Sequence, residues 1–234
     1  MTVLGIDTST PDVTVAATRG ERTLAERRVA PPAGERPRHA SALLPCIEEV
    51  VAEVGGWDAV STLAVGIGPG SFTGLRIGVA TARALAQARG LPLAPVGSLA
   101  ALAHGIGRSP RSSGRERLAL TDARRGEVFA ALFGADGTDS WAPMAIEPED
   151  LARRLAGRPP PLAAGDGALR FRAELDAGAE ILPEGDPAHR LSAGSVCLLA
   201  TQPVERLESV RPLYLRQPDA EVWLERDRGN PTRG

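Results

Sequence analysis

The N-terminal part of the chain contains three runs of β-branched and other apolar residues, at 3–8, 13–18 and 23–29. Turn-forming residues at 9–12 and 19–21 separate the runs. Short β-branched runs between turns are typical of strands that pair as hairpins. The pattern predicts a meander of three strands at the start of the chain.

A helical period follows, because apolar residues recur on one face over the next segment. These residues are Leu43, Leu44, Ile47, Val50, Val51 and Val54. Gly55 and Gly56 are expected to end the helix. Pro45 must lie in its first turn or kink it, since a proline further inside costs about 3 kcal/mol. The outer face is acidic through Glu48, Glu49 and Glu53.

Strands and helices then alternate along the chain. The pattern predicts a strand at 63–67, a glycine-rich loop at 66–74, a helix at 75–89, a strand at 93–96 and a helix at 98–106. Such alternation requires parallel strands joined by crossover helices, whereas the first three strands form hairpins. The fold is therefore α/β with a mixed sheet. The polar, non-periodic segment 105–117 is expected to be a linker.

The second half repeats this order in reduced form. We predict strands at 118–121, 127–133, 141–146 and 162–164, and helices at 148–155 and 193–200. The similarity of element order indicates an internal structural repeat. The predicted domains are therefore 1–105, a linker at 106–117, a reduced C-terminal lobe at 118–225 and a disordered tail at 226–234.

Composition narrows the possible functions. The chain has 234 residues with a formal net charge of -2, and all 27 of its basic residues are arginines, which excludes lysine-dependent chemistry. Its two cysteines, Cys46 and Cys197, lie in apolar runs typical of buried, reduced thiols. The chain begins without the pattern of a signal peptide, and we find no apolar stretch of membrane-spanning length. We expect a cytoplasmic protein that does not associate with a membrane.

The segment 66–78 is the most distinctive candidate for chemistry, because a glycine-dense turn before a helix can bind an anion. The alternative is a purely structural turn with Ser71 or Thr73 as the helix N-cap. On the following helix Gly74, Gly78, Ala82 and Ala86 recur every four residues and flatten one face. That face could pack on the chain's own sheet or on another subunit.

Other candidate sites are weaker. The histidines His39, His104 and His189 are too far apart in the sequence to share a helix face, so no metal site is expected. Asp7, at the end of the first strand, could handle phosphate or could be an exposed turn acid. No acidic residue occurs at 59–115, which carries six arginines, including Arg76 and Arg83. This polarity indicates a solvated face, an acidic partner or an RNA backbone.

Five motifs together resemble the bacterial TsaB family, also called YeaZ. They are Gly-Ile-Asp-Thr-Ser at 5–9, His-Ala-Ser-Ala-Leu-Leu-Pro at 39–45, the glycine stretch at 68–78, Asp-Ala-Arg-Arg-Gly-Glu-Val-Phe at 122–129 and Pro-Leu-Tyr-Leu-Arg at 212–216. The resemblance implies an actin-like, Hsp70-like fold of two lobes, each built on a ribonuclease H-like unit with a mixed sheet, the second lobe being reduced.

The resemblance also implies a function. Members resemble a degenerate copy of TsaD, the subunit that transfers a threonylcarbamoyl group to adenosine 37 of tRNAs reading codons that begin with A. They support TsaD as a heterodimer, together with the small ATPase TsaE, and form homodimers when TsaD is absent. The expected docking surface lies on the helices at 39–54 and 75–89, and tRNA is reached only through the complex.

The resemblance assigns three sets of residues. The expected partner interface is Leu43, Ile47, Glu48, Val51, Gly74, Arg76, Gly78, Ala82 and Arg83. The family motif loop is Gly68, Gly70, Ser71, Thr73 and Gly74. The vestigial phosphate loop is Asp7, Thr8 and Ser9. On this interpretation Gly78→Arg abolishes docking by filling the flat helix face.

Departures from TsaD indicate that the chain has no catalytic residues of its own. The metal-binding His-x-x-x-His of TsaD-like proteins is reduced to His39, with Leu43 four residues on. Thr8, Ser9 and Thr10 follow the first-strand aspartate where a glycine is usual. ATP and metal are therefore expected on TsaD and TsaE. The alternative is a self-sufficient ATP-binding protein, or a hydrolase or peptidase with Ser71 or Cys46 as nucleophile.

Overall fold

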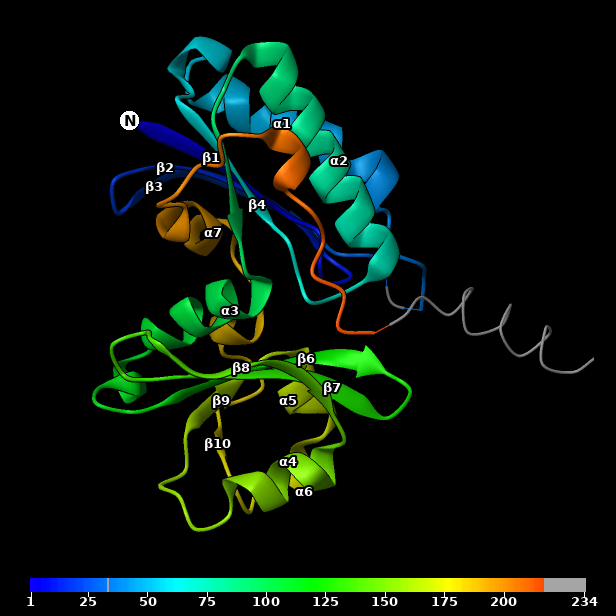
Figure 1. Cartoon of the computed structure of the whole chain (residues 1–234), viewed down its shortest axis with the longest axis vertical. Helices are drawn as coiled ribbons and strands as arrows, with labels where there is room; N and C mark the ends of the chain where they lie inside the picture. Colours follow the sequence, from blue (N-terminus) through cyan, green and yellow to red (C-terminus); the bar gives the residue numbers. More distant parts are fainter. Residues whose placement is uncertain (33, 217–234) are drawn as a thin grey trace, which may run out of the picture.

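The computed structural model describes residues 1–32 and 34–216 and consists of two lobes stacked along the long axis (Figure 1). Each lobe contains one five-stranded sheet. The first lobe is built from β1 (Thr2–Asp7), β2 (Val13–Arg19), β3 (Arg22–Val29), α1 (His39–Glu53), β4 (Thr62–Gly66), α2 (Phe72–Arg89) and β5 (Leu93–Val96). The next helix, α3 (Ser98–Gly107), follows β5 in the chain but packs on the second sheet, against β6, β7 and β9. The predicted tail at 226–234 lies outside the described residues.

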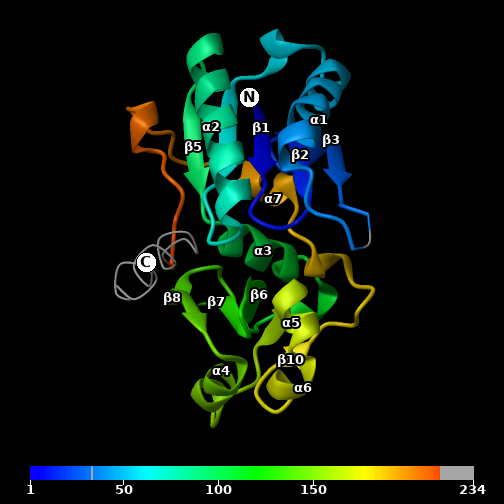
Figure 2. The same ribbon diagram turned by 90° about the vertical axis from the view of Figure 1, so that its right-hand side faces the viewer.

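The first sheet has the strand order β3-β2-β1-β4-β5. Strand β1 pairs antiparallel with β2 and parallel with β4, so the sheet is mixed, as the sequence predicts. Every residue of β1 is buried because the sheet is covered on both faces. Leu4 and Ile6 point toward α1 and α2, whereas Val3 packs with α7 (Ala193–Leu199) on the other face. Figure 2 shows α1 and α2 on their side of the sheet.

The second sheet repeats this topology in the order β8-β7-β6-β9-β10. Its meander is followed by two parallel strands, as in the first lobe, so the predicted internal repeat is confirmed. The elements are β6 (Arg117–Arg124), β7 (Glu127–Phe133), β8 (Asp139–Ile146), α4 (Pro148–Leu155), β9 (Leu162–Ala164), α5 (Asp166–Arg170), α6 (Arg172–Leu175) and β10 (Glu180–Ile181). Single 3-10 turns occur at Trp57–Ala59, Pro110–Ser112, Pro187–His189 and Leu207–Ser209.

At three places the structure adds to what the sequence predicts. Helix α1 begins at His39, so Pro45 lies inside the helix and not in its first turn. The predicted linker at 105–117 contains the end of α3 and a 3-10 turn in which the buried Ser112 hydroxyl donates to Gly107 O over 2.7 Å. The sequence pattern missed α5, α6 and β10, because elements of two to five residues are too short to show a period.

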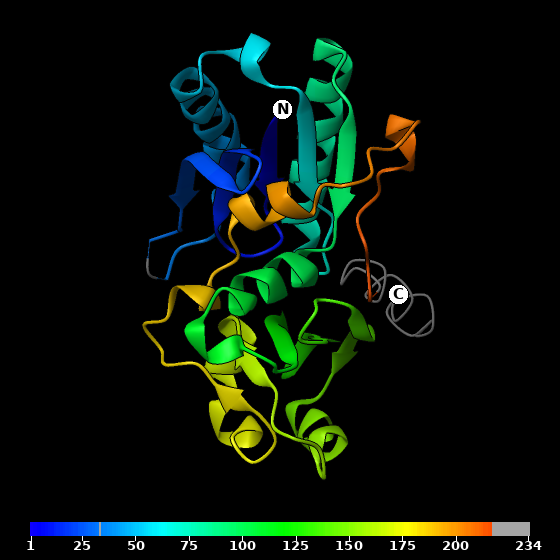
Figure 3. The same ribbon diagram turned by 90° about the vertical axis from the view of Figure 1, so that its left-hand side faces the viewer.

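The contacts between elements cross the two halves of the sequence. Helix α7 follows the second sheet in the chain but contacts β1 and β2 of the first (Figure 3). The Sγ atom of Cys197 on α7 lies 2.6 Å from the point where a Cβ on Gly5 would stand. The helix therefore lies close against the sheet at the one residue of β1 that has no side chain. The domain boundaries predicted from the sequence stay a prediction. Both cysteines are free and buried, as expected.

Candidate functional site

The end of β1 forms a buried polar unit around Asp7. Its carboxylate accepts hydrogen bonds from Ser9 N at 2.7 Å, Ser9 Oγ at 2.6 Å and, on the other oxygen, Ser98 Oγ at 2.7 Å. Burial raises the pKa of Asp7, and the bonds from Ser9 and Ser98 oppose that rise by favouring the carboxylate. Asp7 is fully buried, so its interpretation as an exposed turn acid is wrong.

The glycine stretch packs onto this unit. A Cβ on Gly70 would lie 2.3 Å from Ser9 O, one on Gly74 2.1 Å from Thr8 O, and one on Gly78 2.2 Å from Thr8 Oγ1. Real Cβ atoms do not approach other atoms this closely, so each position requires glycine. The backbone of Ser71 donates to Ser9 O at 2.7 Å, and its side chain accepts from Gly74 N as the N-cap of α2. The glycine stretch therefore packs against the end of β1 in its own chain.

The flat face of α2 therefore has an internal partner. Gly74 and Gly78 contact the β1 end, and Ala82 lies in the core cluster of the first lobe. The expected interface role of these three residues is corrected: their faces are covered by their own lobe. Gly78→Arg would place its side chain against Thr8 and disturb the fold before it reached any docking surface.

His39, the first residue of α1, belongs to the same buried unit. Its Nε2 lies 2.8 Å from Thr10 O, and its ring stands 2.9 Å from the position of a Gly74 Cβ. The ring therefore ties the start of α1 to the β1–β2 turn and to the start of α2. Within 1–32 and 34–216 no cluster of three His, Cys, Asp or Glu side chains could hold a metal ion.

The outer surface of α1 and α2 carries only part of the predicted interface. Leu43, Ile47 and Val51 are at most 4% exposed and belong to the core, which corrects their expected place in an interface. The solvent-facing side of α1 includes Leu44, 49% exposed, and Glu48. The apolar period of the helix identified the inward face, and it cannot by itself identify a binding face.

Two small residues lie on the exposed side of α2. Ala80 and Ala84 are exposed. Ile77 is half-buried and packs against the core of the first lobe. Arg83 is half-buried, while the exposed Arg76 has its guanidinium 3.9 Å from the centre of the Phe72 ring. Exposed alanines leave room for another backbone to approach, so this side of α2 is open to a partner.

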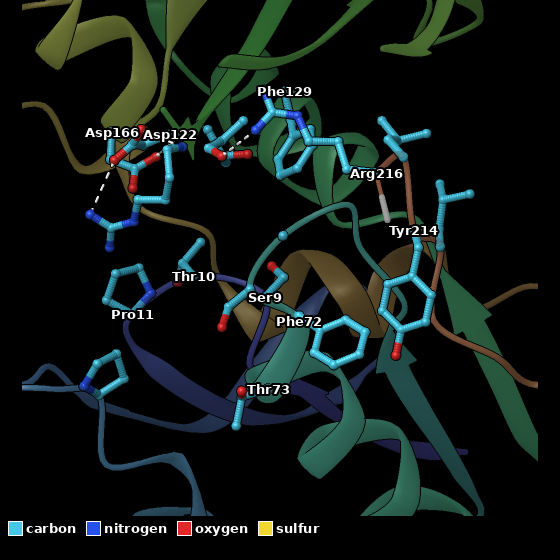
Figure 4. Close-up of a pocket in the computed structure, with 18 of the residues that line it drawn as sticks. Ser9, Thr10, Pro11, Phe72, Thr73, Asp122, Phe129, Asp166, Tyr214 and Arg216 are labelled. Atoms are coloured by element: carbon cyan, nitrogen blue, oxygen red, sulfur yellow. Dashed lines mark hydrogen bonds and ion pairs between the residues drawn. The ribbon is translucent and has the colours of Figure 1, made fainter. Parts of the chain in front are cut away.

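A cavity of about 410 Å³ lies between the lobes (Figure 4). Its walls include the β1–β2 turn, the start of α2, the β6–β7 turn, Asp166 of α5 and the segment 213–216. A second cavity of about 550 Å³ shares Thr10, Pro11, Thr121 and Asp166 with it. Cavities of this size suit small ligands.

Paired charges line the second-lobe side of this cavity. Asp122 accepts from Arg170 Nη1 at 2.7 Å and lies 3.3 Å from Arg124 Nη1. Burial raises the pKa of Asp166, and the nearby Asp122 carboxylate adds to the rise. Phe72, Phe129 and Tyr214 supply aromatic surface. The cavity can therefore take a polar ligand with a flat apolar part.

Sequence reasoning missed the cavity as a site. Asp122 was singled out only within a family motif, and Asp166 was not singled out at all. The two lie on elements separated by β7 to β9, and Asp122 N donates to Asp166 Oδ1 at 3.0 Å only because β6 and α5 meet in the fold. Arg124 and Arg125 at the β6–β7 turn adopt positive φ although neither is glycine, a feature that only the structure reveals.

None of the helices in the described residues is long and apolar enough to span a bilayer.

The family model for TsaD, tRNA N6-adenosine threonylcarbamoyltransferase, matches residues 27–170. An uncharacterized protein of Mycobacterium bovis is 34% identical over 228 residues, covering 94% of this chain and 93% of its own length. The tRNA threonylcarbamoyladenosine biosynthesis protein TsaB of Escherichia coli is 32% identical over 160 residues, 66% of each chain.

Solved structures agree with these relatives. YeaZ from Pseudomonas aeruginosa superposes with a TM-score of 0.74 at 28% identity, over 92% of this chain and 99% of that one. A second Pseudomonas aeruginosa structure, described as similar to peptidase YEAZ, gives a TM-score of 0.76 at 29% identity with the same coverage. The two repeated mixed sheets are the architecture of the actin-like, Hsp70-like fold expected from the sequence. The chain belongs to the TsaD/TsaB (YeaZ) family.

Proposed function

We propose that the chain is a non-catalytic scaffold subunit in the synthesis of threonylcarbamoyladenosine in tRNA. It acts in the cytoplasm, docks on TsaD through the exposed side of α1 and α2, and joins TsaE in a ternary complex. ATP and metal belong to TsaD and TsaE, and tRNA is engaged through the complex. In the absence of TsaD the same surface makes a homodimer.

The observation that carries the proposal is the closed end of β1. The amide of Ser71 donates to Ser9 O, and Ser9 in turn donates twice to Asp7, so these groups are satisfied within the chain. A Gly70 Cβ would already meet Ser9, so this glycine serves the close packing of the loop on the end of β1. Donors that are committed to internal acceptors are poor ligands for a substrate. This arrangement supports a structural role for the glycine stretch.

The docking half of the proposal rests on the exposed surface of the two helices. Leu44 is a large apolar side chain left 49% exposed, and Ala80 and Ala84 permit close approach of another helix. Glu48 adds an acidic position at the same surface, while Glu49 and Glu53 are engaged by Arg27 in ion pairs of 3.1 and 2.7 Å. A partner with apolar and basic side chains fits this face.

The first test uses variants that leave the fold intact. Ala80→Arg and Ala84→Arg add a bulky cation to solvent-exposed positions, so we expect an unchanged melting temperature and loss of the complex with TsaD on a sizing column. Ala173→Arg, at an exposed position of α6 in the other lobe, is the matched control and keeps the complex. Failure of the unmodified chain to bind TsaD would sink the proposal.

The second test measures the contribution to the reaction. We expect tRNA modification by TsaD and TsaE to require this chain, and the isolated chain to give none. The two α2 variants should lose support of modification and homodimer formation together, because both use one surface. If the variants sedimented as monomers and still supported tRNA modification fully, homodimer formation and TsaD support would use different surfaces. That result would contradict a shared surface.

The alternative is an autonomous ATP-binding protein, which the interlobe cavity favours by its size and its aromatic and arginine lining. Calorimetric titration of the isolated chain with ATP and magnesium decides it: the scaffold proposal expects no heat of binding. The hydrolase alternative has less support. Ser71 caps α2, and burial raises the pKa of the Cys46 thiol, so neither is an activated nucleophile.

A further inference from the structure

The last described segment of the chain, residues 200–216, runs from α7 back along the first lobe to the mouth of the interlobe cavity (Figure 3). We call it the strap. Val204 N donates to Leu93 O at 2.9 Å, which adds the strap to the edge strand β5. Val210 is 1% exposed within the core of the first lobe. The strap is therefore fixed to the first lobe by a backbone hydrogen bond and by burial.

The strap then fastens to the glycine stretch. Leu213 N donates to Ile67 O at 2.7 Å, and Leu213 O stands 3.1 Å from where a Gly68 Cβ would lie. The φ of Gly68 is +102°, a conformation that only glycine adopts readily. The close approach of the strap thus depends on the backbone shape of the loop that precedes α2.

An aromatic contact joins the next strap residue to α2. The ring centres of Tyr214 and Phe72 are 4.9 Å apart, and Arg76 Nε donates to Tyr214 Oη at 3.2 Å. The Arg76 guanidinium also lies over the Phe72 ring. Tyr214 is still 39% exposed, so this aromatic contact lies at the surface and is not part of the core.

The end of the strap reaches the second lobe. Arg216 Nη1 donates to Ala123 O at 3.0 Å, and its guanidinium forms an ion pair with Glu127 across the β6–β7 turn. Leu215 packs against the core cluster that includes Phe129 and Phe133. Within four residues the strap passes from contacts with the first lobe to contacts with the second.

We propose that residues 213–216 act as a clamp that holds the two lobes at a fixed separation and so fixes the width of the interlobe cavity. Two-lobe proteins that close around ligands do so by hinge rotation between the lobes. Here the strap lines the mouth of the cavity and contacts both lobes. Opening requires loss of the Arg216 contacts, and closing is resisted by the Tyr214 and Leu215 side chains in the wall.

The experiment compares the full chain with chains that end after Arg216 and after Arg211. Spin labels on Ala52→Cys in α1 and Ala173→Cys in α6 report the distance between lobes, and the native cysteines are buried. We expect the same narrow distance distribution for the full chain and the chain ending at Arg216. The chain ending at Arg211 should give a broader one. An unchanged distribution in the shortest chain overturns the clamp.

A point variant keeps the test decisive if the shortest chain does not fold. Arg216→Ala removes a charge-assisted hydrogen bond and an ion pair that anchor the end of the strap, so hydrogen exchange of the Leu213 amide, which donates to Ile67 O, should accelerate by about tenfold or more. Arg211→Ala, at an exposed position of the same strap, is the control and should leave exchange unchanged. Equal exchange in Arg216→Ala and the unmodified protein refutes the proposal. Neither readout depends on TsaD, so the result is independent of the proposed function.

Discussion

Gly78→Ala tests whether the flat face of α2 serves the fold or a partner. The added methyl carbon would stand 2.2 Å from Thr8 Oγ1, which is fully buried and donates to Gly74 O at 2.8 Å. The Thr8 hydroxyl must rotate or α2 must move away from β1. Either response breaks the hydrogen bond that joins Thr8 to the first turn of α2.

The magnitude follows from three terms. The lost hydrogen bond costs about 1 kcal/mol, and overpacking of a tight contact costs about 1–3 kcal/mol. Alanine offsets about 1 kcal/mol of this through its higher helix propensity. The net loss in free energy of unfolding is about 1–3 kcal/mol. At about 2–4 °C per kcal/mol for a chain of this size, the melting temperature falls by roughly 2–12 °C.

Thermal and urea unfolding of three variants provide the assay. Gly105→Ala in α3 is the matched control, since no atom lies within 4 Å of its Cβ position, and it should stabilise. In a Thr8→Ala background, the atom of residue 8 nearest to the added methyl carbon is Cβ, 3.5 Å away. The effect of Gly78→Ala on the free energy of unfolding should then become neutral or favourable. A Gly78→Ala protein that unfolds like the parent but no longer binds TsaD would refute the reasoning.

Three further measurements follow from the same structure. Burial raises the pKa of Asp7 in the folded protein above its ordinary 3.8. Protonated Asp7 therefore contributes its full share to the free energy of unfolding below pH 3.8, and this contribution is lost as the pH rises through the raised pKa. Unfolding midpoints of the parent should therefore fall relative to Asp7→Asn from acid to neutral pH, and parallel pH profiles would contradict this. Burial also raises the pKa of Cys197 to about 12, so alkylation of this thiol should require unfolding of the protein. Mass spectrometry measures the alkylation, and labelling of the folded protein at the rate of the unfolded protein would refute the prediction. Glu48→Arg should weaken TsaD binding by roughly two- to fivefold in calorimetry, because it places a cation opposite the basic side chains expected of the partner. The effect should shrink at high salt, and a salt-independent loss would point to packing instead.

The regular elements could be predicted because each carries its own period. Strands at 13–18 and 93–96 and the helix at 148–155 lie where alternation or helical spacing placed them, to within a residue. The repeat of element order also survived in sequence, since strand and helix patterns depend on local alternation of apolar and polar residues. Family motifs then supplied the function that composition alone could not.

The binding residues could not be predicted in the same way. The sequence marked Gly74, Gly78 and Ala82 as a flat face and Leu43 as part of an apolar face, and both statements hold. It could not say what each face touches, because a helical period fixes which residues share a side and not which neighbour covers that side. The structure places these residues in the core and leaves Leu44, Ala80 and Ala84 outside.

The sequence by itself thus determined the mixed sheet of the first lobe, the repeat of its element order in the second half and the family. Only tertiary structure decided that the glycine stretch packs on Thr8 and Ser9, that Asp122 and Asp166 meet, and that α7 and the strap return to the first lobe. These contacts join residues far apart in the chain, and their energy depends on distances that no local pattern of residue types encodes.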